Sequence, residues 1–299
     1  MSSVPDLAVS APPTAESGRT VKRSPISTDW ITRPLFGILL AGAALWVTLL
    51  GGMPFVLFIA VGSAAGLREW HRLFSERYMF PAALTMIAMI AALLWQLYAV
   101  PMAGPFSQVI SLACLLTGCL ANLALGLWRQ ETPLSHAAGA FYIGLPAVTL
   151  LMLRQSMPHP TWLVVLLFLA VWATDTGALL SGNLIGGPKL APALSPKKTW
   201  AGSIGGLICA AVVAAGLALI WRVQILPAVA FGCVTSLAAQ MGDLFESLIK
   251  RRVGRKDSGG LIPGHGGVLD RIDSILFAAP VAAFLVLAIG FDPVAGLQP

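Results

Sequence analysis

The chain has 299 residues, of which 57% are hydrophobic and 11% are charged, and its formal net charge is +6. A soluble domain has roughly 25% charged residues, so this composition excludes an ordinary soluble protein and predicts a polytopic membrane protein. No nucleic-acid-binding signature accompanies the basic residues, so we expect no nucleic-acid partner. The four cysteines lie in apolar segments without CxxC pairs, which argues against a zinc site or a disulfide framework.

Residues 1–33 are polar and rich in Ser, Pro and Thr, and they are predicted to form a disordered tail without a cleaved secretory signal. Residues 34–299 are predicted to form one all-α transmembrane domain. A helix needs roughly 20 apolar residues to cross about 30 Å of hydrocarbon. About nine such segments follow, at residues 35–50, 53–67, 80–100, 107–128, 138–153, 160–180, 203–221, 225–247 and 272–290.

The first two of these segments are divided only by Gly51 and Gly52, so they could form a short hairpin or one long helix. With nine spans, the N-terminal tail and the even-numbered loops carry all of the 19 basic residues except Arg154 and Arg222. Lys and Arg collect on the cytoplasmic side of membrane proteins. We therefore predict an integral protein of the cytoplasmic (inner) membrane, with its N-terminus in the cytoplasm and its C-terminus on the opposite side.

The third to fifth spans contain few polar groups and are expected to serve as scaffold. Three later segments contain the groups that could carry chemistry, and all three adjoin the predicted cytoplasmic face. The first is TDTGALLSGNLIGGPKLAPALSPKKTWAG, residues 174–202. Asp175 lies about five residues inside the predicted sixth span, about 8 Å deep. A carboxylate at that depth indicates function, unless it only reaches a loop lysine or the interface.

The loop that follows contains Ser195, Lys197, Lys198 and Thr199, whose hydroxyl and ammonium groups suit a polyphosphate ligand. The alternative is a turn-rich cytoplasmic loop that only obeys the charge rule. The loop has no Walker A motif.

The second segment is the end of the eighth span, SLAAQMGDLFESLIK, residues 236–250. Its polar residues recur at helical spacing and form one stripe, which consists of Ser236, Gln240, Asp243, Ser247 and Lys250. We interpret Asp243 as a metal ligand. Glu246 lies beside the stripe and could instead pair with Lys250 at i, i+4.

The third segment is SLIKRRVGRKDSGGLIPGHGGVLDRID, residues 247–273. Asp270 and Asp273 lie at i, i+3 at the start of the ninth span, where they could act as N-cap and N3 residues. One hairpin joins them to Asp243, so the three carboxylates can meet at the membrane surface. Such oxygen ligands suit Mg²⁺, which shares its remaining positions with water and substrate phosphates.

This third segment closely resembles the signature of the phosphatidate cytidylyltransferase family, also called CDP-diacylglycerol synthases. GDLFESLIKR and LSPKKTWAG also resemble this family, and the matching region covers about residues 175–273. Two positions differ, since Ala201 stands where the family usually has Glu, and Asn183 stands where a basic residue is expected. The matching positions of the signature are Ser247, Lys250, Arg251, Lys256, Asp257, Pro263, His265, Gly266, Gly267, Asp270, Arg271 and Asp273.

The resemblance implies a Mg²⁺-dependent nucleotidyltransferase of phospholipid biosynthesis. It would transfer the cytidylyl group of CTP to phosphatidic acid from the bilayer, giving CDP-diacylglycerol and pyrophosphate at the cytoplasmic face. A second cation such as K⁺ and a homodimer are left open. The expected metal ligands are Asp243, Asp270 and Asp273. The expected catalytic residues are Asp243, Asp270, Lys250, Arg251, Lys256, Asp257 and His265. The expected substrate-binding residues are Ser195, Lys197, Lys198, Thr199, Asp175, Ser247 and Arg271.

Two other classes of membrane protein fit the sequence less well. A transporter or ion channel also has intramembrane carboxylates, but these lie more often near mid-bilayer, between related halves. Here the carboxylates cluster at one face, and we find no internal repeat. A CDP-alcohol phosphatidyltransferase is disfavoured, because its characteristic Asp-Gly and Ala-Arg arrangement is missing from the sequence.

Overall fold

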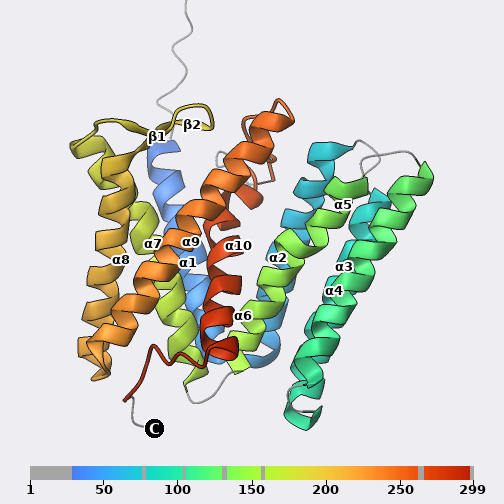
Figure 1. Ribbon diagram of the computed structural model, residues 1–299, viewed down its shortest axis with the longest axis horizontal. Helices are drawn as coiled ribbons and strands as arrows, with labels where there is room; N and C mark the ends of the chain where they lie inside the picture. Colours follow the sequence, from blue (N-terminus) through green and yellow to red (C-terminus); the bar gives the residue numbers. More distant parts are fainter. Residues whose placement is uncertain are drawn as a thin grey trace, which may run out of the picture.

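The computed structural model describes residues 29–75, 79–103, 106–129, 133–155, 159–261 and 266–296. In these ranges the chain is a bundle of helices with one small β-hairpin at an end of the bundle (Figure 1). The elements are α1 (Asp29–Leu50), α2 (Gly52–Phe74), α3 (Met79–Ala103), α4 (Phe106–Arg129), α5 (Pro133–Gly139), the π-helix η1 (Ala140–Gly144), α6 (Leu145–Gln155), α7 (Pro160–Leu184), β1 (Lys189–Ala191), β2 (Ser195–Thr199), α8 (Trp200–Trp221), α9 (Ile225–Arg252), α10 (Leu269–Ala283) and the π-helix η2 (Phe284–Ala288).

The helices agree with the predicted all-α transmembrane domain. Eight helical segments of the described chain are long and apolar enough to cross a membrane, with α5, η1 and α6 counted as one and α10 and η2 as another. A ninth, within α1, is a shorter apolar helix over Gly37–Leu50. Each predicted span therefore corresponds to one helical segment of the structure.

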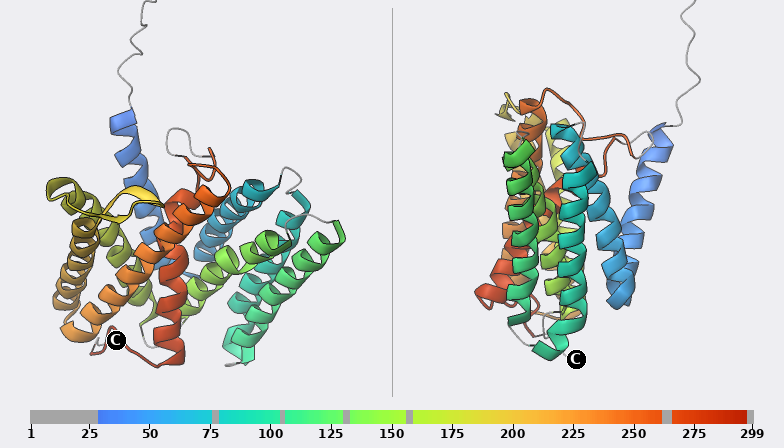
Figure 2. Two further views of the ribbon diagram at one scale, coloured as in Figure 1. Left: turned by 45° about the horizontal axis from the view of Figure 1, so that its top comes forward. Right: turned by 90° about the vertical axis from the view of Figure 1, so that its right-hand side faces the viewer.

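The first two spans are separate helices that form a hairpin (Figure 2). Gly51 breaks the chain between them with φ +65°, a left-handed conformation that glycine adopts without strain. A side chain at this position would also collide with the guanidinium group of Arg154. That guanidinium donates from Nε to the carbonyl oxygen of Thr48 at 2.9 Å, so it fixes the end of α1.

Several helices are longer than the predicted spans. The helix α2 continues to Phe74, so the segment after residue 67 is helical rather than part of a loop. The helix α7 continues to Leu184, so Asp175 lies nine residues before its end rather than about five. The helix α1 begins at Asp29, within the predicted tail, and residues 1–28 lie outside the described residues.

The tight packing of α7 against α8 depends on small residues. The buried face of α8 has a small residue at every fourth position, namely Gly202, Gly206, Ala210, Ala214 and Ala218. A Cβ atom at Gly206 would lie only 2.7 Å from the carbonyl oxygen of Thr174 on α7. Small residues at this spacing let two membrane helices approach closely. The contact brings the end of α7, which carries Asp175, beside the start of α8.

The two ends of the bundle differ in their connections. The start of α1, the β1–β2 hairpin and the connection between α9 and α10 lie at one end (Figure 1). The segment after η2 lies at the other end, where the backbone amide of Gln224 donates to the carbonyl oxygen of Ala295 at 3.0 Å. This arrangement agrees with an odd number of spans, as the sequence predicted.

Substitution of Gly206 tests the close contact of α7 with α8. We expect Gly206→Leu to destabilise the protein by about 1–3 kcal/mol, because the added side chain has no room. In Gly216→Leu the same change is made on the same helix, at a position with no heavy atom within 4 Å of a Cβ atom. Thermal unfolding in detergent should show a lower melting temperature for Gly206→Leu but not for Gly216→Leu. Equal melting temperatures for the two variants would contradict the close contact.

Candidate active site

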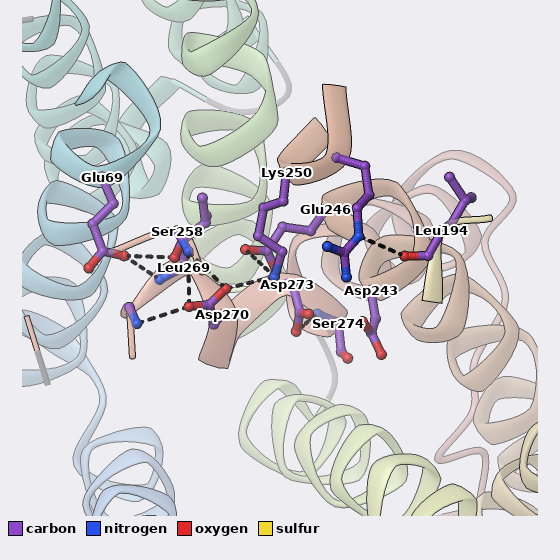
Figure 3. A network of polar contacts seen from close by, with 12 residues as sticks. Glu69, Leu194, Asp243, Glu246, Lys250, Ser258, Leu269, Asp270, Asp273 and Ser274 are labelled. Carbon is purple, nitrogen blue, oxygen red and sulfur yellow. Dashed lines mark hydrogen bonds and ion pairs between the residues drawn. The ribbon is translucent and has the colours of Figure 1, made fainter. Parts of the chain in front are cut away.

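The three polar segments identified in the sequence meet at the end of the bundle that carries the β-hairpin (Figure 3). The site is built on α9 and α10, with further groups from α7 and β2. Gly242 of α9 lies against the backbone of α10, since a Cβ atom there would be 2.5 Å from the carbonyl oxygen of Asp273. This close approach brings the carboxylate at position 243 next to the first turn of α10.

Asp270 is the most heavily bonded of the predicted carboxylates. Its Oδ1 accepts from Nζ of Lys250 at 2.7 Å, and its Oδ2 accepts from the backbone amide of Gly267 at 2.9 Å. The amide of Ser258 donates to the same carboxylate, at 3.2 Å from Oδ2. Asp270 is the second residue of α10, whose N-cap is Val268. The carboxylate thus satisfies amides of the α9–α10 connection and also fixes an ammonium group.

The β-hairpin is fixed to α9 by two contacts. Nζ of Lys198, on β2, lies 2.5 Å from Oδ2 of Asp243. Nε of Arg251, near the end of α9, donates to the carbonyl oxygen of Leu194 at 3.3 Å. The hairpin therefore holds the ammonium group of Lys198 directly against the carboxylate of Asp243.

Asp175 joins α7 to the same site. Its Oδ1 accepts from Oγ of Ser274 at 3.2 Å, and the amide of Ser274 donates to Oδ1 of Asp273 at 2.7 Å. Although Asp175 lies inside a membrane-crossing helix, its side chain is exposed, and 37% of the Asp243 side chain is exposed. These two carboxylates can therefore be reached from outside the protein.

Glu246 gives the site a further negative charge. It is 1% exposed, and its Oε1 lies 3.4 Å from Nζ of Lys250, so the i, i+4 pair considered in the sequence is present. Neither carboxylate oxygen has a hydrogen-bond partner among the described residues. The site then combines five carboxylates with two closely paired ammonium groups. The carboxylates are Asp175, Asp243, Glu246, Asp270 and Asp273, and the ammonium groups belong to Lys198 and Lys250.

The excess of negative charge and the many carboxylate oxygens, which can act as metal ligands, fit a divalent cation. Mg²⁺ usually takes one or two protein carboxylates. Asp243 and Asp273 lie on α9 and α10, whose backbones are in contact at Gly242. Among the described residues, however, no three His, Cys, Asp or Glu side chains are already arranged around one point as a metal site. Asp243 is paired with Lys198, and Asp270 is paired with Lys250 and with loop amides, so the set of three metal ligands stays a prediction.

The polar stripe of α9 has two parts with different uses. Ser236 and Gln240 bind neighbouring helices, since Oγ1 of Thr174 donates to Oγ of Ser236 at 2.8 Å and Ser203 donates to Oε1 of Gln240. Asp243 and the residues after it belong to the site. Hence only the second half of the stripe contributes side chains to the candidate active site.

The described residues that remain from the predicted site lie on β2, α9, α10 and the connection between α9 and α10. Thr199 is buried, and its hydroxyl accepts from the amide of Gly202 at 3.0 Å as the N-cap of α8. Ser195 lies in β2, opposite Ala191, and Ser247 lies one turn after Asp243. His265 lies outside the described residues. The exposed residues of this group are Lys197, Lys256, Asp257 and Arg271.

Sequence reasoning missed Glu69, which lies on α2 and contacts the α9–α10 connection (Figure 3). The second apolar segment ends at residue 67, so the sequence predicts a loop after it. The helical spacing of Gly66, Glu69, Trp70 and Leu73 was the signal that could have shown a buried helical face.

Comparison with known proteins gives the family. The chain matches the model of the Cytidylyltransferase family over residues 31–289. The phosphatidate cytidylyltransferase of Brucella suis biovar 1 (strain 1330) is 38% identical over 276 residues, which cover 88% of this chain and 94% of that protein. The protein of the same name from Staphylococcus aureus (strain COL) is 34% identical over 268 residues, covering 85% and 98%. These matches confirm the resemblance seen in the signature, and the chain belongs to the cytidylyltransferase family.

Proposed function

We propose that this membrane protein transfers the cytidylyl group of CTP to phosphatidic acid, giving CDP-diacylglycerol and pyrophosphate. The observation that carries the proposal is the meeting of paired lysines and aspartates from β2, α9 and α10 at one end of a membrane bundle. A lipid phosphate can reach such a place from the bilayer, while a nucleotide arrives from water. The names of the relatives, phosphatidate cytidylyltransferases, support these substrates.

The chemistry requires charge control more than proton transfer. An oxygen of the lipid phosphate attacks the α-phosphorus of CTP, and the bond from that phosphorus to the bridging oxygen breaks. Pyrophosphate leaves with the electron pair of that bond. The attacking oxygen is already anionic, so the main barrier is the approach of two anions. Ammonium groups held in place before the reaction reduce this barrier without reorganisation.

Two lysines are held where their ammonium groups can reduce the repulsion between the two substrates. Lys198 and Lys250 are fixed by Asp243 and Asp270, so their ammonium groups are ordered before substrate binds. Arg251, Lys197 and Lys256 lie on the exposed side of the same end and can bind the outer phosphates or the pyrophosphate. Positioning of this kind lowers the entropy cost of bringing two substrates together.

Asp243 and Asp273 would hold Mg²⁺, with Asp175 and Glu246 nearby. The bound ion would neutralise charge on the phosphate oxygens of CTP. Asp270 serves the same centre by fixing Lys250, whether or not it also reaches the ion. We leave open a second cation such as K⁺ and the formation of a homodimer.

We place the site on the cytoplasmic side of the inner membrane, with the C-terminal segment on the opposite side. The distribution of basic residues supports this orientation, because the end that carries the site also carries Lys189, Lys197, Lys198 and the basic run after Ile249. CTP is then available where the site opens. A transporter is disfavoured, because the carboxylates collect at one end of the bundle, where they lie beside lysines.

Product formation tests the proposal directly. Purified protein in detergent with labelled CTP, phosphatidic acid and Mg²⁺ should form CDP-diacylglycerol. We expect Asp243→Asn to lower the rate by about 100-fold or more, because the proposed Mg²⁺ ligand and the partner that fixes Lys198 are lost together. In the control Asp292→Asn, the altered carboxylate accepts from the amide of Val294 near the C-terminus, and the rate should stay that of the wild type. Absence of product with the wild type would refute the function, and full activity of Asp243→Asn would refute the site.

The pair of Lys250 and Asp270 is expected to contribute to both stability and activity. Their side chains are only 14% and 11% exposed, so Lys250→Gln should cost roughly 3–5 kcal/mol by leaving a buried charge unpaired. The double variant Lys250→Gln with Asp270→Asn removes both charges and should regain most of the melting temperature. It should stay inactive, because the ammonium group is missing. Recovery of activity together with stability would indicate that the pair is only structural.

A further inference from the structure

Glu69 is a charged residue that no step of the proposed chemistry uses. It lies on α2 and is 2% exposed. In the sequence it stands 200 residues before Leu269, the first residue of α10. Its carboxylate nevertheless lies against the α9–α10 connection (Figure 3). A buried carboxylate is costly unless its partners compensate for the loss of water, so its contacts need an explanation.

The carboxylate binds the start of α10. Its Oε2 accepts from the backbone amide of Leu269 at 2.8 Å and from Oγ of Ser258 at 3.3 Å. Leu269 is the first residue of α10, and the first amides of a helix have no partner inside the helix. A negative charge at this end is also favoured by the helix dipole. Glu69 therefore caps α10 from a different helix.

The connection is shaped to receive this carboxylate. A Cβ atom at Gly267 would lie 2.5 Å from Oε2, and a Cβ atom at Gly259 would collide with Oε1. Only glycine at these two positions lets the chain approach Glu69 so closely. The Oε1 atom is buried and has no hydrogen-bond partner among the described residues.

Ser258 links Glu69 to the active site. Its hydroxyl donates to Glu69, and its amide donates to Asp270. Two carboxylates from different helices therefore hold one serine, and Asp270 at the same time holds Nζ of Lys250 at 2.7 Å. Displacement of Ser258 would disturb the geometry of the pair on which the proposed phosphate binding depends.

The helix α2 is itself fixed beside Glu69. Nε1 of Trp70 donates to the carbonyl oxygen of Ser135 at 2.8 Å, and Nδ1 of His71 lies 2.8 Å from Nδ1 of His136. Both contacts join α2 to α5, on the side of the bundle away from α9. The scaffold helices thus hold the segment of α2 that carries Glu69, independently of its contacts with the connection.

We propose that Glu69 is a positioning residue for the reaction. It fixes Ser258 and the start of α10, and through them Asp270 and Lys250. The inference rests on the proposed function for its effect on activity, but its structural part can be measured without substrate. Removal of a residue that orients the groups of an active site typically changes activity or ligand affinity by about 10–100-fold.

The test compares Glu69→Ala, Glu69→Gln and the control Thr85→Val in the full-length protein. Thr85 lies in the same buried polar network as His71, with Oγ1 3.1 Å from Nε2 of His71, and its hydrogen-bond partners among the described residues lie on α2, α3 and α4. Hydrogen exchange is measured on peptides that cover residues 253–261 and 266–273. Melting temperature, kcat and KM for CTP are measured on the same samples.

We expect Glu69→Ala to speed exchange in both peptides and to lower kcat/KM for CTP by about 10–100-fold. Glu69→Gln keeps an oxygen acceptor for Leu269 and should show smaller effects. Thr85→Val should lower the melting temperature without changing exchange in these peptides. Wild-type exchange in Glu69→Ala, or the same exchange pattern in Thr85→Val, would overturn the inference. If the wild type forms no product, the proposed function fails, whereas the exchange result still decides the role of Glu69.

Discussion

The close approach of α9 and α10 is the constraint on which the rest of the site depends. With glycine at position 242, the backbone of α9 can lie against that of Asp273, which brings carboxylates of two helices to the same end of the bundle. Like charges near one another repel, so the arrangement needs compensating cations. Lys198 and Lys250 supply two of them, each held at 2.5–2.7 Å from an aspartate oxygen. The remaining negative charge is what favours a bound divalent ion and explains why basic side chains surround an acidic centre.

Each helix brought to this centre is held by contacts outside it. Small residues hold α7 against α8, and hydrogen bonds of Ser236 and Gln240 join α9 to both of those helices. The aromatic ring of Tyr142, in the middle of the π-helix η1, packs against Phe245 and Phe277 with centroids 5.3 and 6.3 Å away. The site is therefore supported from three sides by groups that need not touch a substrate. Such support keeps catalytic groups within the narrow geometry that phosphate transfer requires.

Sequence reasoning found the spans, the polar end of α9 and the carboxylates of the signature, because each follows from helical spacing or from the cost of charge in a membrane. It also anticipated the pair of Glu246 with Lys250. Helical spacing could have shown that Glu69 is buried, but it could not show its partners, since Leu269 and Ser258 lie about two hundred residues later in the chain. Similarly, periodicity placed Ser236 and Asp243 on one stripe, but only the neighbouring helices separate the packing residue from the site residue.

The central claim is that Asp243 and Asp273 hold a divalent ion beside the two lysine pairs. Binding of Mn²⁺, which accepts the same oxygen ligands as Mg²⁺, can be followed by electron paramagnetic resonance on purified protein with and without CTP. The account predicts that the wild type binds Mn²⁺ and that CTP strengthens the binding. It also predicts that the double variant Asp243→Asn with Asp273→Asn loses this binding while it stays folded. Equal Mn²⁺ binding by the wild type and the folded double variant would contradict the account.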